Sequence, residues 1–168
     1  FVLLNQQLGL EGIKQLCKLL KLSKNDTKSI ILTYTSSLII PQKSESYLRL
    51  YRFIIGDRWR QVLMLSKVIC QHGLNNNFSE VNVDFFDQIV SLIVGLPKNK
   101  IQSQLIDGNW LMKTTNIGQG QKLGRLKEWL YRIQIENDLS EISDVNRYLA
   151  KIQWHNSDFE SWPRMSLQ

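Results

Sequence analysis

The chain has 168 residues, of which 43% are hydrophobic, 10% aromatic and 21% charged, and its formal net charge is +6. This composition is typical of a globular protein and excludes a disordered chain. No apolar run reaches the roughly 20 residues that a membrane span needs, so we expect no membrane partner. The positive charge favours polyanions.

The ends of the chain and its cysteines suggest where the protein works. The first residue is Phe1 rather than Met, which predicts a fragment or a processed chain. Cys17 and Cys70 both fall inside apolar helical patterns, as buried free thiols do, and no secretory signal is recognisable. We therefore expect an intracellular, reducing compartment, either the cytoplasm or an organelle.

Apolar residues recur at helical spacing along almost the whole chain, which predicts an all-α fold, a bundle of about seven to eight helices. The main helices are expected at residues 9–22, 26–39, 44–55, 57–72, 83–95, 121–138 and 143–153, with shorter helical turns around 100–105 and 108–118. Candidate N-caps are Ser23, Asn25, Asp26, Ser44, Asp84, Ser140 and Ser143. No two-residue hairpin turn is present that would indicate strands.

Leu96 and Pro97 mark one expected domain boundary. Residues 1–96 are expected to form a helical body domain. Residues 97–168 are expected to form a helical tail domain with a glycine-initiated basic helix and, from His155, a loose C-terminal extension.

Charge is concentrated in two blocks. The stretch from Lys43 to Lys67 has six basic and two acidic residues, and the stretch from Lys113 to Arg132 has five basic and one acidic. From Ile133 to the end there are three basic and six acidic residues. The two basic blocks are therefore the places to look for an anionic partner.

The helix expected from Gln121 has two stripes of different chemistry. The apolar stripe comprises Leu123, Leu126, Leu130 and Ile133. The other stripe has the same spacing, displaced by one residue and thus by about 100°, and comprises Lys122, Arg125, Trp129 and Arg132. One side is expected to pack in the core, while the basic side either contacts a polyanion or is solvated. Trp129 fits equally a stacking and a packing role.

Glycines surround the start of this helix. Gly118, Gly120 and Gly124 leave the backbone uncovered where the first-turn N–H groups have no partners. These groups and the positive end of the helix dipole attract anions, so Lys122 and Arg125 are expected to close around a phosphate. In the alternative, Gly118 and Gly120 only form the turn and Gly124 permits a close helix contact.

The first basic block interleaves arginines with aromatic residues. Its candidate RNA contacts are Arg49, Arg52, Arg58 and Arg60, beside Tyr47, Tyr51 and Trp59. Guanidinium groups pair with phosphates and aromatic rings stack on bases, so the block favours nucleic acid. Arginines that form salt bridges above a core containing Tyr51 and Trp59 are the alternative.

The segment LIDGNWLMKTTNIGQGQKLGRLKEWLYRIQIENDL resembles the C-terminal region of tRNA nucleotidyltransferases, the CCA-adding enzymes, and of related bacterial-type poly(A) polymerases. The residues that match the family pattern are Leu105, Gly108, Leu111, Met112, Gly120, Leu123, Gly124 and Leu130. Gln121 departs from it, because the family usually has proline there. The resemblance extends from about Leu16 to Leu149 and is most specific between Gly108 and Leu130.

The resemblance implies an RNA-binding body and tail of an enzyme that adds CCA, or part of it, to tRNA 3′ ends. The catalytic carboxylates, the Mg²⁺ and the CTP and ATP substrates would belong to an N-terminal head domain that this chain lacks. The partners it implies are that head and the acceptor and T-arms of tRNA. This part would hold the acceptor end in position for the reaction.

We expect no catalytic residue, no metal site and no cofactor in this chain. Asp84 and Asp87 have the spacing to share a metal, but Asp84 better fits a helix cap. His72 fits a helix end. Two other functions stay open: a repurposed non-catalytic RNA-binding subunit of a ribonucleoprotein such as an organellar ribosome, and a helical protein-interaction domain with solvated basic faces.

Overall fold

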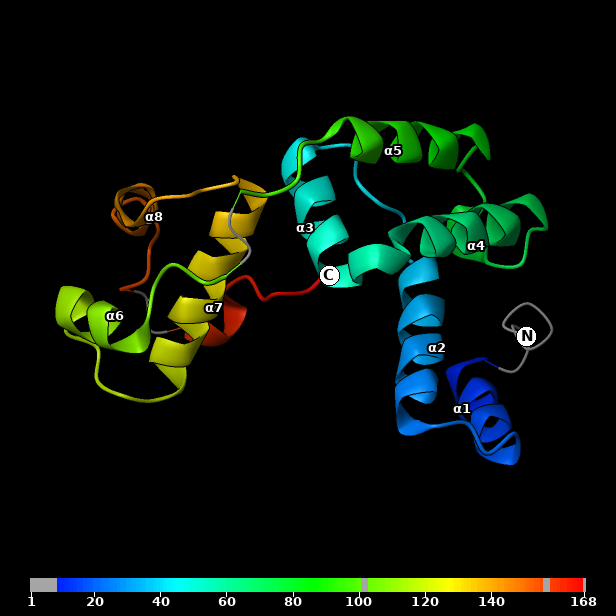
Figure 1. The fold of residues 1–168 in the computed structure, drawn as a ribbon, viewed down its shortest axis with the longest axis horizontal. Coiled ribbons are helices and arrows are strands. Elements are labelled where there is room, and N and C mark those ends of the chain that lie inside the picture. The colour runs from blue at the N-terminus through cyan, green and yellow to red at the C-terminus, as the bar shows by residue number, and fades with distance from the viewer. Residues whose placement is uncertain (1–8, 101–102, 156–157, 168) are drawn as a thin grey trace. The chain divides into compact units, whose positions relative to one another are not determined.

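A computed structural model describes residues 9–100, 103–155 and 158–167 (Figure 1). The described residues form α-helices and short 3₁₀ turns and no strand, which confirms the predicted all-α fold. None of these helices is both long enough and apolar enough to cross a membrane. The chain divides into two compact units: unit 1 comprises residues 1–43 and 55–95, and unit 2 comprises residues 44–54 and 96–168.

Unit 1 is a succession of packed helices. Its elements are α1 (Gly9–Leu19), α2 (Lys24–Ser37), α4 (Trp59–Gln71) and α5 (Asp84–Gly95), with 3₁₀ turns at Gly56–Arg58 and Asn76–Phe78. Each helix packs on the next: α1 on α2, α2 on α4, and α4 on α5. In Figure 1 the α1–α2 pair extends away from α4 and α5, and its connecting turn lies at the far end.

Small polar groups let α2 and α4 approach each other in unit 1. The hydroxyl of buried Ser66 in α4 donates to the carbonyl oxygen of buried Ser37 at 2.9 Å, so a buried hydrogen bond joins the two helices. Between α1 and α2 a smaller apolar cluster forms from Ile13, Cys17 and Tyr34. Both cysteines are free thiols, as expected, but only Cys17 is buried, and Cys70 is half-buried.

Unit 2 is built around one long helix. Its elements are α3 (Glu45–Ile55, of which residues up to 54 belong here), α6 (Gly108–Thr115), α7 (Gln121–Glu136), α8 (Ile142–Leu149) and a 3₁₀ turn at Phe159–Ser161. The predicted apolar stripe of α7 is buried. It joins a core that comprises Ile106, Leu111, Leu123, Leu126, Leu130, Ile133, Val145, Leu149 and Trp162.

The structure differs from the expected organisation in its units and its ends. Helix α3 groups with the residues after 96, so no single cut at that point separates the units. Residues 159–167 are no loose extension, because the side chain of Trp162 is only 6% exposed within the unit 2 core. An aromatic side chain of this size buries enough apolar surface to fix a segment that has no regular periodicity.

Several local predictions are corrected as well. Of the helix expected around 100–105, residues 101–102 lie outside the described part and 103–105 are not helical. Helix α8 begins after Glu141, without a side-chain cap from either predicted serine. At α5 the first-turn Asp84 N–H donates to the Asn82 side chain at 3.0 Å, so Asn82 takes the capping role predicted for Asp84. Ser23 caps α2 as predicted.

Candidate nucleic-acid interface

The turn between α6 and α7 leaves the start of α7 without a side-chain cap. Asp107 caps α6 by accepting from the Trp110 N–H at 2.7 Å, and Asn116, with φ 56°, follows the last residue of α6 as its C-cap. Gly120 precedes α7 with φ 157°, a conformation that only glycine adopts readily. Because glycine has no side chain, the first-turn amides of α7 receive no hydrogen bond acceptor from a cap side chain.

Gly124, in the first turn of α7, has no structural reason to be glycine. It is exposed, its φ is not positive, and a Cβ built on it would meet no atom of the described residues within 4 Å. The alternative reading of Gly124 as a close helix contact is therefore wrong. A glycine inside a helix costs about 0.5–1 kcal/mol relative to alanine. Gly124 therefore destabilises α7, and no contact within the described chain requires a glycine at this position.

The predicted basic stripe of α7 is in contact with a segment near the C-terminus. We call residues 159–167 the C-terminal strap. The indole of Trp162 in the strap packs on Trp129, with ring centroids 5.5 Å apart, and Lys122 Nζ lies 5.9 Å from the Trp162 ring centroid. The Met165 N–H donates to the Glu128 carboxylate at 2.7 Å. Trp129 thus has a packing role.

Both arginines of this stripe are engaged within unit 2. Arg125 pairs with Glu128 and donates to the Trp162 carbonyl oxygen at 2.6 Å. Arg132 pairs with Glu136 at 2.8 Å and donates to the carbonyl oxygens of strap residues 164 and 166 at 2.7 and 3.1 Å. These guanidinium groups bind backbone oxygens in the way that arginines bind phosphate oxygens.

The two arginines of α3 are also used internally. Arg49 is buried, pairs with Glu45 and lies 3.6 Å from an Asp138 carboxylate oxygen. Arg52 donates to the carbonyl oxygens of Leu96, at 3.0 Å, and Pro97. Burial and the nearby Arg49 charge lower the pKa of the Arg52 guanidinium. Both side chains therefore tie α3 to later parts of unit 2.

The remaining predicted contacts lie in unit 1. Arg58 and Arg60 are exposed at the start of α4, and the Arg60 guanidinium lies 4.4 Å from the Trp59 ring centroid. Trp59 itself is buried, which agrees with the alternative in which it packs in the core. The predicted arginine line is therefore divided between two units. Helix α3 of unit 2 contributes Arg49 and Arg52, and the 3₁₀ turn and the start of α4 in unit 1 contribute Arg58 and Arg60.

Three lysines of the second basic block have no ion pair within the described part of the chain. Lys113 is exposed at the end of α6, and Lys122 and Lys127 are half-exposed in α7. Lys127 follows Gly124 by three residues, so it lies on the same side of α7 one turn further on. The uncapped amides, the open Gly124 backbone and Lys127 thus share one side of the α7 start.

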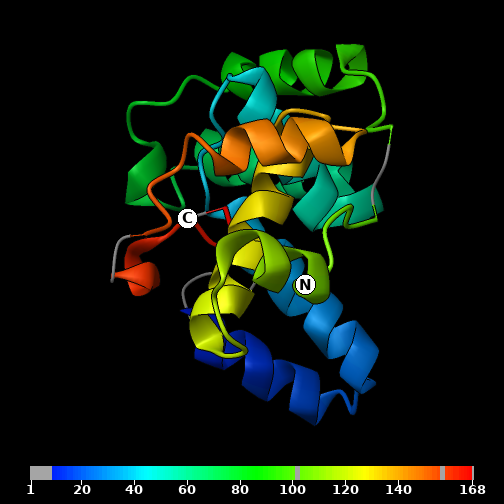
Figure 2. The same ribbon diagram turned by 90° about the vertical axis from the view of Figure 1, so that its left-hand side faces the viewer.

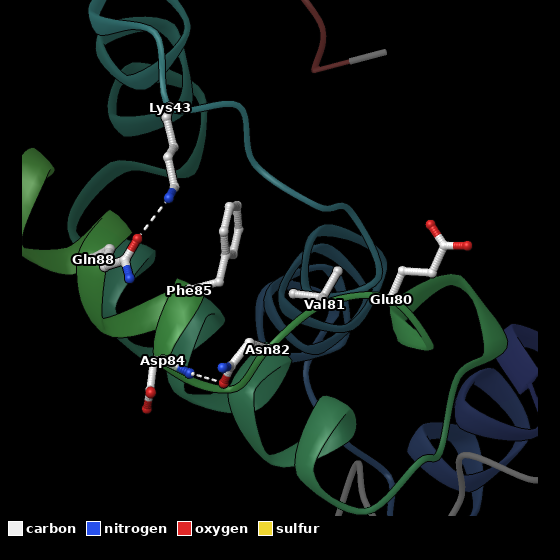
Figure 3. Close-up of a pocket in the computed structure, with 7 residues that line it drawn as sticks. All are labelled: Lys43, Glu80, Val81, Asn82, Asp84, Phe85 and Gln88. Atoms are coloured by element: carbon white, nitrogen blue, oxygen red, sulfur yellow. Dashed lines mark hydrogen bonds between the residues drawn. The ribbon is translucent and has the colours of Figure 1, made fainter.

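Unit 1 has a second candidate site, a pocket of about 370 Å³ at the start of α5 (Figure 3). Lys43 Nζ lies 5.2 Å from the Phe85 ring centroid and donates to Gln88 at 2.6 Å. The carboxylate of Asp84 points outward from this group (Figure 3). Asp87 is paired with Lys67 at 2.6 Å, and no cluster of three metal-ligating side chains occurs among residues whose positions are described.

Comparison of the chain with protein-family models, with curated proteins and with solved structures found no match to any of them. The resemblance of its motifs to the tRNA nucleotidyltransferases therefore stays a prediction.

Proposed function

We propose that this chain is an RNA-binding body and tail of a tRNA nucleotidyltransferase. In this role it holds the tRNA acceptor and T-arms, while a catalytic head outside the chain adds CCA, or part of it, to the 3′ end. The observation that carries the proposal is Gly124, an exposed helical glycine that destabilises α7 and leaves its backbone open beside uncapped amides.

A phosphate group accounts for this combination. The amides of the α7 first turn supply donors and the positive end of the helix dipole, and they are not covered by a cap side chain. At Gly124 the missing Cβ removes the atom that would keep an oxygen away from the backbone. Lys127 on the same side and Lys122 in the first turn add charge that no carboxylate of the described chain neutralises.

The proposed contact set is narrower than the one expected from sequence. It comprises Gly120, Gly124, Lys122 and Lys127. Arg125 and Arg132 support it indirectly, because they hold the C-terminal strap on α7. Such contacts bind the RNA backbone and carry no sequence preference, which suits a part that positions many different tRNAs.

The test is the salt dependence of binding to a tRNA transcript. Replacing Lys122 and Lys127 with Gln should weaken binding and lower the slope of log affinity against log salt by about 1.5, because each phosphate contact contributes about 0.7–0.9. The matched control is R147Q/R164Q, which removes the same charge from two exposed arginines paired with Asp144 and Glu160. Equal slopes for the two double variants would contradict the proposal.

Replacement of Gly124 by Ala separates binding from folding. The added methyl group meets no atom of the described chain, so the variant should be more stable than the original by about 0.5–1 kcal/mol in urea unfolding. If a phosphate contacts this backbone, the same methyl group should weaken tRNA binding. A variant that is stabilised and binds with unchanged affinity would remove Gly124 from the site.

A further inference from the structure

The turn between α1 and α2 concentrates exposed lysines that neither basic block of the sequence includes. We call this group the lysine turn: Lys18, Lys21, Lys24 and Lys28. All its members are exposed, and none forms an ion pair with a carboxylate in the described part of the chain. The nearest acid along the chain, Asp26, accepts the Ser23 hydroxyl at 2.7 Å and its backbone N–H is capped by the same serine.

The backbone of the lysine turn places a lysine where glycine is favoured. Helix α1 ends with the Leu22 N–H bonded to the Cys17 carbonyl oxygen at 3.1 Å and the Lys21 N–H bonded to the Lys18 carbonyl oxygen at 3.0 Å. This closure requires a left-handed residue, and Lys21 supplies it with φ 51°. A side chain in this conformation is strained, so Lys21 adds charge at the expense of stability.

Lys24 also occupies an electrostatically unfavourable place. It is the first residue of α2, where the positive end of the helix dipole repels cations. Lys28 lies one turn further along the same side, because the i, i+4 spacing aligns the two side chains. Natural sequences break such local rules mainly at functional sites, and here both departures add positive charge to one small surface.

We infer that the lysine turn is a second RNA-backbone contact surface, on unit 1. The inference rests on the proposed function and adds a contact that is separate from α7. Both views of the ribbon show the turn at the end of the α1–α2 pair remote from α4 and α5 (Figures 1 and 2). The four lysines of the turn are exposed. Flexible ammonium groups without acidic partners suit the phosphates of a polynucleotide.

An anionic membrane is the other surface that such charge attracts, and Leu19 and Leu20 nearby are 75% and 53% exposed. Binding in a membrane interface needs a continuous apolar helix face. The apolar face of α1 is used inside unit 1, where Ile13 and Cys17 are buried against α2. RNA is therefore the better match.

The test compares two triple variants of the full chain with equal net charge. K18Q/K21Q/K28Q neutralises three of the four lysines of the turn. The control K14Q/K43Q/K67Q neutralises three lysines whose Nζ atoms contact Glu11, Gln88 and Asp87. Affinity for a tRNA transcript is measured against KCl concentration. The turn variant should lower the salt slope by about 2–3, from about 0.7–0.9 for each phosphate, and the control variant by less than about 1.

The outcomes separate this inference from the proposed function. Equal salt slopes for the two triple variants would contradict the inference that the lysine turn contacts RNA. The proposed function would still stand if K122Q/K127Q weakens tRNA binding. A reduced slope in the turn variant alone supports the lysine turn, even if the α7 variant binds normally. If the original chain binds phosphatidylserine vesicles rather than tRNA, and K18Q/K21Q/K28Q abolishes that binding, both proposals are wrong.

Discussion

The basic stripe of α7 and the lysine turn of unit 1 use positive charge in opposite ways. In the α7 stripe Arg125 and Arg132 are half-buried and bind carboxylates and carbonyl oxygens of their own chain. In the lysine turn every cation is exposed and without an acidic partner in the described chain. The α7 stripe has three cations and the lysine turn has four, within spans of equal length, and only the lysine turn keeps all of its cations free of acidic partners among the described residues.

Side-chain chemistry explains the difference. A guanidinium group is planar, has several donors and is weakly hydrated, so it can be buried while it satisfies more than one oxygen. An ammonium group is compact and strongly hydrated and stays in water unless an anion replaces that water. The arginines should therefore contribute mainly to stability and the lysines mainly to binding.

The largest effect is expected from Trp162→Ala. This change removes the strap residue that is buried in the unit 2 core, and truncation of a buried aromatic residue costs about 3–5 kcal/mol. Urea unfolding should show this loss. Glu160→Gln, an exposed change in the same strap, should shift stability by less than about 0.5 kcal/mol. A Trp162 variant of unchanged stability would show that the strap does not hold unit 2 together.

A smaller loss is expected from Arg132→Met. The variant keeps much of the side-chain length but leaves Glu136 and two strap carbonyl oxygens without their donor, at a cost of about 2 kcal/mol. Its salt slope for tRNA binding should match that of the original chain, because the guanidinium is already occupied. A lower salt slope for tRNA binding with unchanged stability would show that Arg132 contacts RNA and does not stabilise the fold.

Tyr51→Phe tests a buried hydroxyl of α3. The Tyr51 hydroxyl is buried and has no hydrogen-bond partner in the described part of the chain, so its removal should stabilise the protein by about 1–2 kcal/mol. Burial also raises the pKa of the Tyr51 hydroxyl above its ordinary value. In the unfolded chain this phenol ionises near pH 10, so stability should fall as the pH rises above 10.

The Phe variant should lose less stability than the original chain between pH 9 and pH 11. Chemical denaturation across that range measures the difference. The half-buried Tyr148, whose hydroxyl donates to Asn137 at 3.0 Å, offers a matched control in Tyr148→Phe. Identical pH dependence of the original chain and the Tyr51 variant would mean that Tyr51 does not cause the decline.

The smallest effect is expected from Lys21→Gly. Glycine accepts the left-handed conformation without strain, so the variant should be more stable by about 1 kcal/mol, as measured by urea unfolding. Removal of one phosphate contact should at the same time lower the salt slope for tRNA binding by about 0.7–0.9. Lys14→Gly, in the middle of α1, is the contrasting control and should be destabilised.

The sequence by itself determined the helices and the buried face of α7, because helical spacing of apolar residues reports burial directly. Periodicity located α3 and α7 closely, and a serine before the second helix identified its cap. The glycines around the start of α7 were also visible as candidates. The sequence did not show whether Gly124 contacts another helix, because that depends on which elements pack against α7.

Only the tertiary structure decided which cations are free. Arg132 meets strap residues 32 and 34 positions further along the chain, and Arg52 meets carbonyl oxygens 44 and 45 positions away. Such partners are brought together by the packing of Trp162 and α3, and no local pattern encodes them. A sequence shows which residues are charged, but whether a charged side chain can bind a partner depends on the groups that folding places around it.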